Sequence, residues 1–276
     1  MKEKSKTIIN KHFKHKRKAY VLFQKQIDKF YKLQDEYQIE NEKHLLGEEI
    51  LLNNNTLIHG TRISVNELNV IKENGLLAPE FLGKYNKNKK KPFVVEFWDI
   101  EENISLKDYI NKYCGLTIEV KGKDGNILKQ IISPINDVEN EILSLKEYRD
   151  YLIYQNQEQR FLPNKYLNNA TMAFIIRIND KNKDLFTNDI FSVQFDKKII
   201  KQIVPKWFYE KYMKNRTFDN YETGREKAIL YGIPSNLIEG ILVNREIEED
   251  SNKLKIIKEQ FPYCYICNID GKVIVE

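Results

Sequence analysis

The stretch Leu57-Ile58-His59-Gly60-Thr61-Arg62 leads into a segment that ends at Glu73-Asn74-Gly75-Leu76-Leu77. Its apolar start predicts a short strand that ends at a histidine. Ser64, with Glu67 three residues later, is a capping-box pattern and predicts a helix that stops at Asn74-Gly75. The sequence therefore predicts a strand followed by a helix, with His59 at the end of the strand.

His59 is a candidate ligand-binding residue because Gly60 and Thr61 follow it. A glycine lets a flat ligand reach backbone N–H and C=O groups, and an imidazole nitrogen can hydrogen-bond a ribose hydroxyl. A core histidine bonded to a backbone carbonyl is the alternative. Arg62, Arg216 and Arg225 could bind a pyrophosphate through charge-assisted hydrogen bonds.

A second stretch, far along the chain, reads Gly224-Arg225-Glu226-Lys227-Ala228-Ile229-Leu230-Tyr231-Gly232-Ile233-Pro234 and ends at Ile238-Glu239-Gly240-Ile241-Leu242-Val243. It predicts two strands around Pro234, with Glu226 at the start of the first. A carboxylate at a strand edge can hold a sugar hydroxyl and stabilise positive charge on a ribose carbon. A surface glutamate is the alternative, and Glu222 is a rival in the same loop.

The remaining pattern mixes short strands irregularly with helices, which is typical of the α+β class rather than a regular parallel array. No internal repeat is present. We expect further strands at 93–98, 116–120, 171–178 and 191–195, helices at 105–113, 139–160, 207–213 and 253–260, and a C-terminal hairpin at 263–275 that turns at Asp270-Gly271.

Residues 5–46 predict one amphipathic helix that ends at Gly47, with an apolar stripe that includes Phe23, Ile27 and Phe30. We expect two domains, a basic helical extension at 1–47 and a main domain at 48–276. Residues 1–32 carry ten Lys and Arg17 against Glu3 and Asp28, a net charge of +9, whereas the rest of the chain carries −4. This basic arm favours an anionic partner. A solvated helix face is the alternative.

Composition excludes several classes of protein. The 276 residues contain no apolar run long enough to cross a membrane, and the lysine-rich N-terminus lacks the apolar core of a secretory signal. Three cysteines, Cys114, Cys264 and Cys267, indicate a reducing, cytoplasmic compartment. Cys264 and Cys267 have the spacing of a metal-ligand pair, but a second pair is missing, so we expect buried thiols and no metal. Phosphate-binding loops, dinucleotide-binding glycine fingerprints and zinc-protease helices are missing as well.

Together, these segments resemble the histidine–tyrosine–glutamate branch of the ADP-ribosyltransferase superfamily, which includes the poly(ADP-ribose) polymerases. The resemblance spans residues 56–243 and implies a split β-sheet core. It implies that His59 holds the adenosine ribose of NAD, that the backbone of Gly60 holds the nicotinamide amide, and that Thr61 and Arg62 bind nearby. A tyrosine stacks on nicotinamide in such enzymes. The segment 93–114 assigns this role to Tyr113, with Tyr109 and Tyr85 as alternatives.

The resemblance also implies that Glu226 is the catalytic residue, which binds the nicotinamide ribose and favours an oxocarbenium-like transition state. The loop at 217–225 would then recognise the acceptor, with Tyr221, Glu222 and Arg225 as its candidate residues.

We therefore expect an NAD-dependent mono-ADP-ribosyltransferase, of the kind found among bacterial or phage toxins and effectors, with an antitoxin or inhibitor as a partner. The basic arm and the lysines at 84–91 favour nucleic acid over protein as the acceptor. One alternative is a non-catalytic nucleic-acid-binding protein with a degenerate transferase fold. Another is an enzyme similar to the tRNA 2′-phosphotransferases, which hold a phosphate with several arginines. A third is an interaction protein whose N-terminal helix pairs with a partner.

Overall fold

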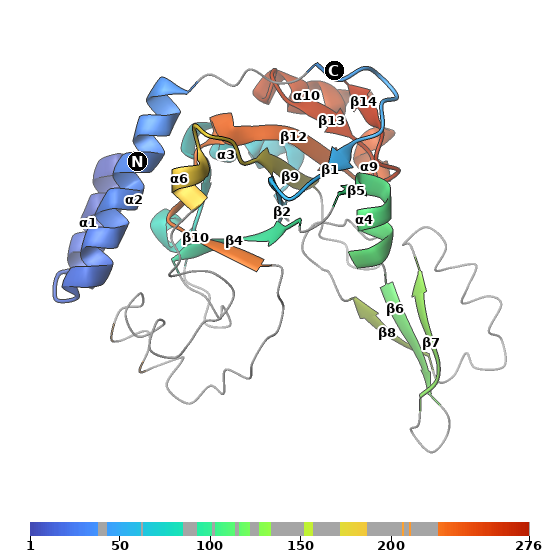
Figure 1. The fold of residues 1–276 in the computed structure, drawn as a ribbon, viewed down its shortest axis with the longest axis horizontal. Helices are drawn as coiled ribbons and strands as arrows, with labels where there is room; N and C mark the ends of the chain where they lie inside the picture. The colour runs from blue at the N-terminus through green and yellow to red at the C-terminus, as the bar shows by residue number, and fades with distance from the viewer. Residues whose placement is uncertain are drawn as a thin grey trace.

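The computed structural model describes residues 1–37, 43–61, 63–84, 93–100, 103–113, 116–121, 127–133, 152–156, 172–186 and 226–275, together with Lys206 and Glu210. In these parts of the chain, helices and strands are mixed, and N-terminal helices pack beside a mixed sheet (Figure 1). The expected α+β class is confirmed. None of the described helices is long and apolar enough to cross a membrane.

Seven of the described strands form the main sheet. Their spatial order is β10 (Glu226–Leu230), β4 (Val94–Asp99), β2 (Thr56–Thr61), β9 (Met172–Arg177), β12 (Ile238–Val243), β13 (Tyr265–Cys267) and β14 (Val273–Val275). Only the pair β12–β13 is parallel. A sheet split like that of the ADP-ribosyltransferases is not shown by this continuous series and stays a prediction.

The sheet lies between two apolar clusters because its strands alternate apolar side chains between the two faces. The larger cluster joins Leu57, Phe97 and Phe174 to the N-terminal helices. The smaller joins Ile58, Ala173 and Leu242 to the helix α4 (Leu106–Tyr113). Neighbouring residues of one strand thus contact different layers, as Leu57 and Ile58 do.

The N-terminal region corrects the expectation of one helix over 5–46. It forms α1 (Lys2–Phe13) and α2 (Arg17–Glu36), which lie side by side as a hairpin (Figure 1). Both helices bury aromatic residues in the larger cluster, and a single straight helix could not bring both apolar faces to it. Gly47 does not end a helix. It lies in a turn with φ of +83°, and its N–H donates to the carbonyl of Val273.

The segment after β2 folds as its capping pattern predicts. The Ser64 N–H and hydroxyl both donate to Glu67 Oε2, at 3.2 and 2.8 Å. The first turn is a 3-10 helix, η1 (Val65–Glu67), and α3 (Leu68–Asn74) follows it. Gly75 has φ of +75° and leads into β3 (Leu76–Leu77), which pairs with β11 (Gly232–Ile233). The two stretches that are far apart in sequence therefore meet here as well as in the main sheet.

Two smaller sheets complete the strands that the structure describes. The pair β1 (Leu51–Leu52) and β5 (Ile104–Ser105) precedes α4, and β6 (Leu116–Lys121) pairs with both β7 (Ile127–Ser133) and β8 (Leu152–Asn156). The helix expected over 139–160 is wrong at 152–156. There, Ile153 and Tyr154 have high strand propensity, and the segment pairs with β6, so tertiary pairing decides the conformation.

The C-terminal region confirms its expected elements, the helix α10 (Ser251–Gln260) and the hairpin β13–β14 with its turn at Asp270-Gly271. Cys264 and Cys267 are buried free thiols, as expected. Burial raises the pKa of Cys264 to about 12 and also raises the pKa of Cys267, so neither thiol is reactive.

The remaining short helices are η2 (Pro79–Leu82), α6 (Lys183–Phe186), η6 (Ser235–Leu237) and α9 (Arg245–Glu248). Among the expected elements, the strand at 191–195 lies outside the described residues, and so does nearly all of the helix at 207–213.

Candidate functional site

His59 lies in the middle of the main sheet, on β2. Its Nδ1–H donates a hydrogen bond to the backbone carbonyl of Glu96 on β4, at 2.8 Å. A carbonyl can only accept, so Nδ1 carries the proton, and Nε2 is an acceptor in the neutral imidazole. The bond to a carbonyl is what a core histidine would make, but His59 is only partly buried.

The strands on either side of His59 diverge. β2 pairs with β9 along its whole length, from Thr56 to Thr61, but pairs with β4 only at Leu57 and Ile58. The last pair of this ladder is Ile58 with Trp98. If the ladder continued, Gly60 would lie opposite Glu96. Instead, the imidazole of His59 forms a hydrogen bond with the Glu96 carbonyl. The His59 side chain therefore links the two strands at the point where their ladder ends.

His59 lies beside an aromatic ring and is followed in sequence by two small residues. Its ring lies 5.3 Å from the ring of Phe97, centroid to centroid, at an angle of 49°. Gly60 pairs with Ala173, and Thr61 pairs with Met172, so both are held by β9. The Thr61 hydroxyl accepts a hydrogen bond from the N–H of Ile63 at 3.2 Å. Gly60 and Thr61 are half-buried.

The backbone of Glu226 lies close to this site. β10 pairs with β4 so that Glu226 is opposite Trp98, and Trp98 is in turn opposite Ile58, the residue before His59. Two strand spacings of about 4.8 Å each separate β10 from β2. The sheet thus brings Glu226, from the second quoted stretch, into the row next to His59, from the first.

The two tyrosines of α4 differ in position. Ser105 caps this helix, because its Oγ accepts from the Asp108 N–H at 3.1 Å and donates to the Asp108 carboxylate at 2.8 Å. Tyr109 is 2 % exposed and belongs to the smaller cluster with Ile58, so its ring packs against apolar side chains. Tyr113 is the last residue of α4.

Several expected site residues lie outside the described residues. They are Arg62, Tyr85, Arg216, Tyr221, Glu222 and Arg225.

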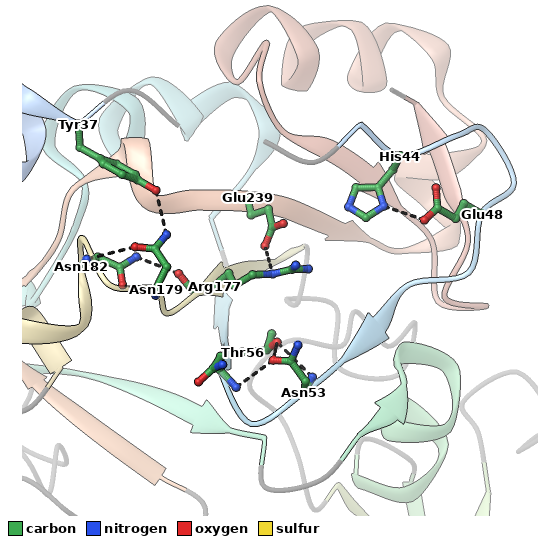
Figure 2. A network of polar contacts seen from close by, with 10 residues as sticks. Tyr37, His44, Glu48, Asn53, Thr56, Arg177, Asn179, Asn182 and Glu239 are labelled. Atoms are coloured by element: carbon green, nitrogen blue, oxygen red, sulfur yellow. Dashed lines mark hydrogen bonds and ion pairs between the residues drawn. The ribbon is translucent and has the colours of Figure 1, made fainter. Parts of the chain in front are cut away.

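A partly buried ion pair that sequence reasoning did not single out lies between β9 and β12. Arg177 Nε is 3.1 Å from Glu239 Oε2, and the Glu239 side chain is only 9 % exposed (Figure 2). The register shifts between Ile238 and Gly240, so Glu239 lies at a β-bulge. The signal in the sequence was one charged residue within the apolar run from Ile238 to Val243.

Two buried residues with left-handed backbones were also missed. Phe93 has φ of +65° and Tyr231 has φ of +70°, values that are uncommon for residues with side chains. They lie opposite each other at the far end of the β4–β10 ladder, where the Tyr231 N–H donates to the Phe93 carbonyl at 3.2 Å. No sequence signal predicts this conformation.

Tyr231 joins the N-terminal helices to this end of the sheet. Its hydroxyl lies 3.0 Å from Ser5 Oγ on α1 and 3.1 Å from the Tyr31 hydroxyl on α2. The ring packs on Phe30 and Phe81, with centroids 5.0 and 4.8 Å away. Burial raises the pKa of Tyr231 well above its ordinary value, so this hydroxyl stays protonated.

A search of protein-family models, curated proteins and solved structures finds no match to this chain. In the described part of the chain, no three His, Cys, Asp or Glu residues form a group that could hold a metal ion.

Proposed function

We propose that this protein is an NAD-dependent mono-ADP-ribosyltransferase that transfers ADP-ribose to a macromolecular acceptor and releases nicotinamide. The observation that carries the proposal is the row Ile58–Trp98–Glu226 across β2, β4 and β10. It brings the backbone of Glu226 to within two strands of Ile58, the residue before His59, although the two stretches are separated by more than half of the chain. His59 and Glu226 are the two residues that the resemblance pairs in one NAD site.

The first support comes from the hydrogen bonding of His59. Because Nδ1 donates to the Glu96 carbonyl, Nε2 is the acceptor nitrogen and is suited to receive a hydrogen bond from a ribose hydroxyl. The same bond fixes the plane of the ring. A ring held in this way loses little conformational entropy when it binds a ligand.

The second support is the divergence of β2 from β4 beyond Ile58. A continuous antiparallel ladder would use its backbone groups in strand pairing. Here Gly60, which has no side chain, lies two residues beyond Ile58, the last residue of that pairing. A flat amide group such as that of nicotinamide can approach a glycine backbone closely.

Glu226 would act on the transition state. As the bond between nicotinamide and the ribose carbon breaks, nicotinamide leaves with the bonding electron pair and positive charge develops on the sugar. The carboxylate stabilises this charge and holds a ribose hydroxyl. The acceptor atom then attacks the ribose carbon, a new bond forms, and the acceptor loses its proton. The atoms balance without a metal or a further co-reactant.

The Glu226→Gln variant tests this proposal. Gln keeps the size and hydrogen bonding of the side chain but removes the negative charge. We expect the rate of nicotinamide release from labelled NAD, in the presence of a cell lysate that supplies the acceptor, to fall on the order of 10²-fold or more. Nuclease or protease treatment of the labelled product then identifies the class of acceptor.

Glu73→Gln is the matched control, because Glu73 is an exposed glutamate on α3. It removes the same charge and should leave the rate unchanged. The two variants should also unfold at the same temperature as the wild type. Equal rates of NAD consumption by wild type and Glu226→Gln would refute the role of Glu226. If none of the proteins consumes NAD with any lysate fraction, the non-catalytic alternative gains support instead.

A further inference from the structure

The turn between α1 and α2 lies in a strongly basic segment of the described sequence. Residues 11–18 read Lys-His-Phe-Lys-His-Lys-Arg-Lys and contain no acidic residue. Lys11, Lys14 and Arg17 are exposed. We call these three residues the basic turn. Lys11 and Lys14 are three residues apart, and Arg17 begins α2 directly after the turn.

Acidic residues pair with the lysines at the opposite, open end of the helical hairpin. The basic turn has no such partner among the described residues. At the open end, Lys2 pairs with Asp28 at 3.8 Å, Lys6 with Glu3 at 3.7 Å and Lys32 with Glu36 at 3.9 Å. In the described part of the chain, no carboxylate lies within ion-pair distance of the basic turn. Among the described residues, its positive charge is therefore not compensated, and such a charge attracts external anions.

The basic turn stands on a rigid base. Phe13, at the end of α1, lies 4.7 Å from the ring of Phe23 on α2 and 5.2 Å from the ring of Phe93 beside β4, centroid to centroid. The turn is closed by a hydrogen bond from the Lys16 N–H to the Phe13 carbonyl at 2.8 Å. The cations thus extend from a packed core element, which limits the entropy lost when they bind a partner.

The lack of aromatic groups at this surface favours a polyanion over a folded protein. Protein interfaces depend on buried aromatic and apolar anchors, whereas contacts to a phosphate backbone need only suitably placed cations. Among the described residues, the exposed large apolar side chains lie elsewhere, except Val21, one turn beyond Arg17. The basic turn therefore has the composition of a phosphate-contacting surface.

We propose that the basic turn binds the phosphate backbone of a nucleic acid and holds it as the acceptor. That this nucleic acid is the acceptor rests on the proposed transferase function, but the binding itself does not.

The test compares two triple variants of the full-length protein with the same change in charge. Lys11→Gln, Lys14→Gln and Arg17→Gln together remove the basic turn. The control combines Lys4→Gln, Lys6→Gln and Lys32→Gln at the open end of the hairpin. Binding of a short, labelled, single-stranded RNA of mixed sequence is measured without NAD at several salt concentrations. Thermal unfolding checks that both variants are folded.

Each phosphate neutralised on a single strand contributes about 0.7 to the slope of log K against log[salt]. The basic-turn variant should therefore lose about 2 from this slope and bind about 10²-fold more weakly in 0.1 M salt, whereas the control should lose less than half as much. Equal losses in the two variants would overturn the proposal. So would tight binding to an acidic polypeptide with none to RNA.

The two proposals fail in different ways. Glu226→Gln should bind the RNA as the wild type does, because it leaves the basic turn intact. If the slope changes as expected but no protein consumes NAD, the nucleic-acid surface stands and the transferase function falls. If NAD is consumed and the basic-turn variant keeps its RNA affinity, the transferase function stands and the surface is refuted.

Discussion

At the scale of single residues, the polar groups with the clearest consequences are buried hydroxyls. The hydroxyl of Tyr231, between β10 and β11, meets those of Ser5 on α1 and Tyr31 on α2, and Tyr231 and Ser5 are fully buried. A buried polar group costs free energy unless it is hydrogen-bonded. The Tyr231 hydroxyl therefore stabilises the docking of α1 and α2 on the sheet by satisfying Ser5.

Tyr231→Phe should lower the free energy of unfolding by about 1–3 kcal/mol, because Ser5 Oγ would lose its partner in a dry environment. Chemical denaturation measures this change. Tyr20→Phe is the control, since the Tyr20 hydroxyl donates to Asn10 at 2.8 Å in an exposed position, and it should cost under about 1 kcal/mol. Equal costs for the two variants would contradict the role of the buried hydroxyl cluster.

At the scale of elements, the pairing of β3 with β11 depends on glycines that no side chain could replace. Gly75 has φ of +75°, and a Cβ on it would lie 2.3 Å from the carbonyl oxygen of Ile233. Gly232 has φ of +146°, and a Cβ on it would lie 2.0 Å from the carbonyl oxygen of Leu76. The backbones of the two quoted stretches are thus in direct contact near Tyr231, at the end of β10.

Gly75→Ala should destabilise the protein by more than about 2 kcal/mol, because backbone strain and a backbone clash both oppose it. Gly83→Ala separates the two effects. Gly83 has φ of +83°, but a Cβ on it would meet nothing within 4 Å, so only the strain of about 1 kcal/mol should remain. Thermal unfolding of both variants gives the comparison. A larger loss for Gly83→Ala would show that close approach does not matter at Gly75.

At the scale of the whole molecule, the N-terminal helices belong to the core of the sheet. Phe13, Phe23 and Phe30 are fully buried in the same cluster as Phe97 and Phe174. The alternative of a free helix that pairs with a partner requires an exposed apolar stripe, but this stripe is already covered by the sheet. The basic turn is what remains on the outer side.

Deletion of residues 1–37 should therefore expose a large apolar face and give a protein that is insoluble or lacks a cooperative unfolding transition. Phe30→Ala tests the same contact more gently, with an expected loss of about 3–5 kcal/mol. Val21→Ala is its control on the same helix, because Val21 is 42 % exposed, and it should change stability by under about 0.5 kcal/mol. A truncated protein that unfolds cooperatively at the wild-type temperature would show that the hairpin is an accessory.

Elements with local signals could be predicted from the amino-acid sequence alone. The strand before His59, the capping box of Ser64 and Glu67, the cap of α4 at Ser105 and the turn at Gly271 depend on neighbouring residues, so their patterns could be read directly. The break between α1 and α2 and the strand β8 were predicted wrongly. Both are decided by contacts with segments far away in sequence, which override local propensity.

For the candidate site, residue types indicate which side chains could do chemistry, whereas long-range strand pairing brings their strands near one another. His59 is a candidate because it is a histidine followed by a glycine. Glu226 is a candidate because it is a charged residue at the start of an apolar strand. The two residues lie in neighbouring rows of the sheet because the strands are ordered β10–β4–β2. Hydrogen bonds between strands that are distant in sequence set this order. The left-handed Phe93 and Tyr231 likewise contact phenylalanines of the N-terminal helices, which are distant in sequence. No local pattern encodes such contacts, since the free energy that maintains them comes from burial between distant segments.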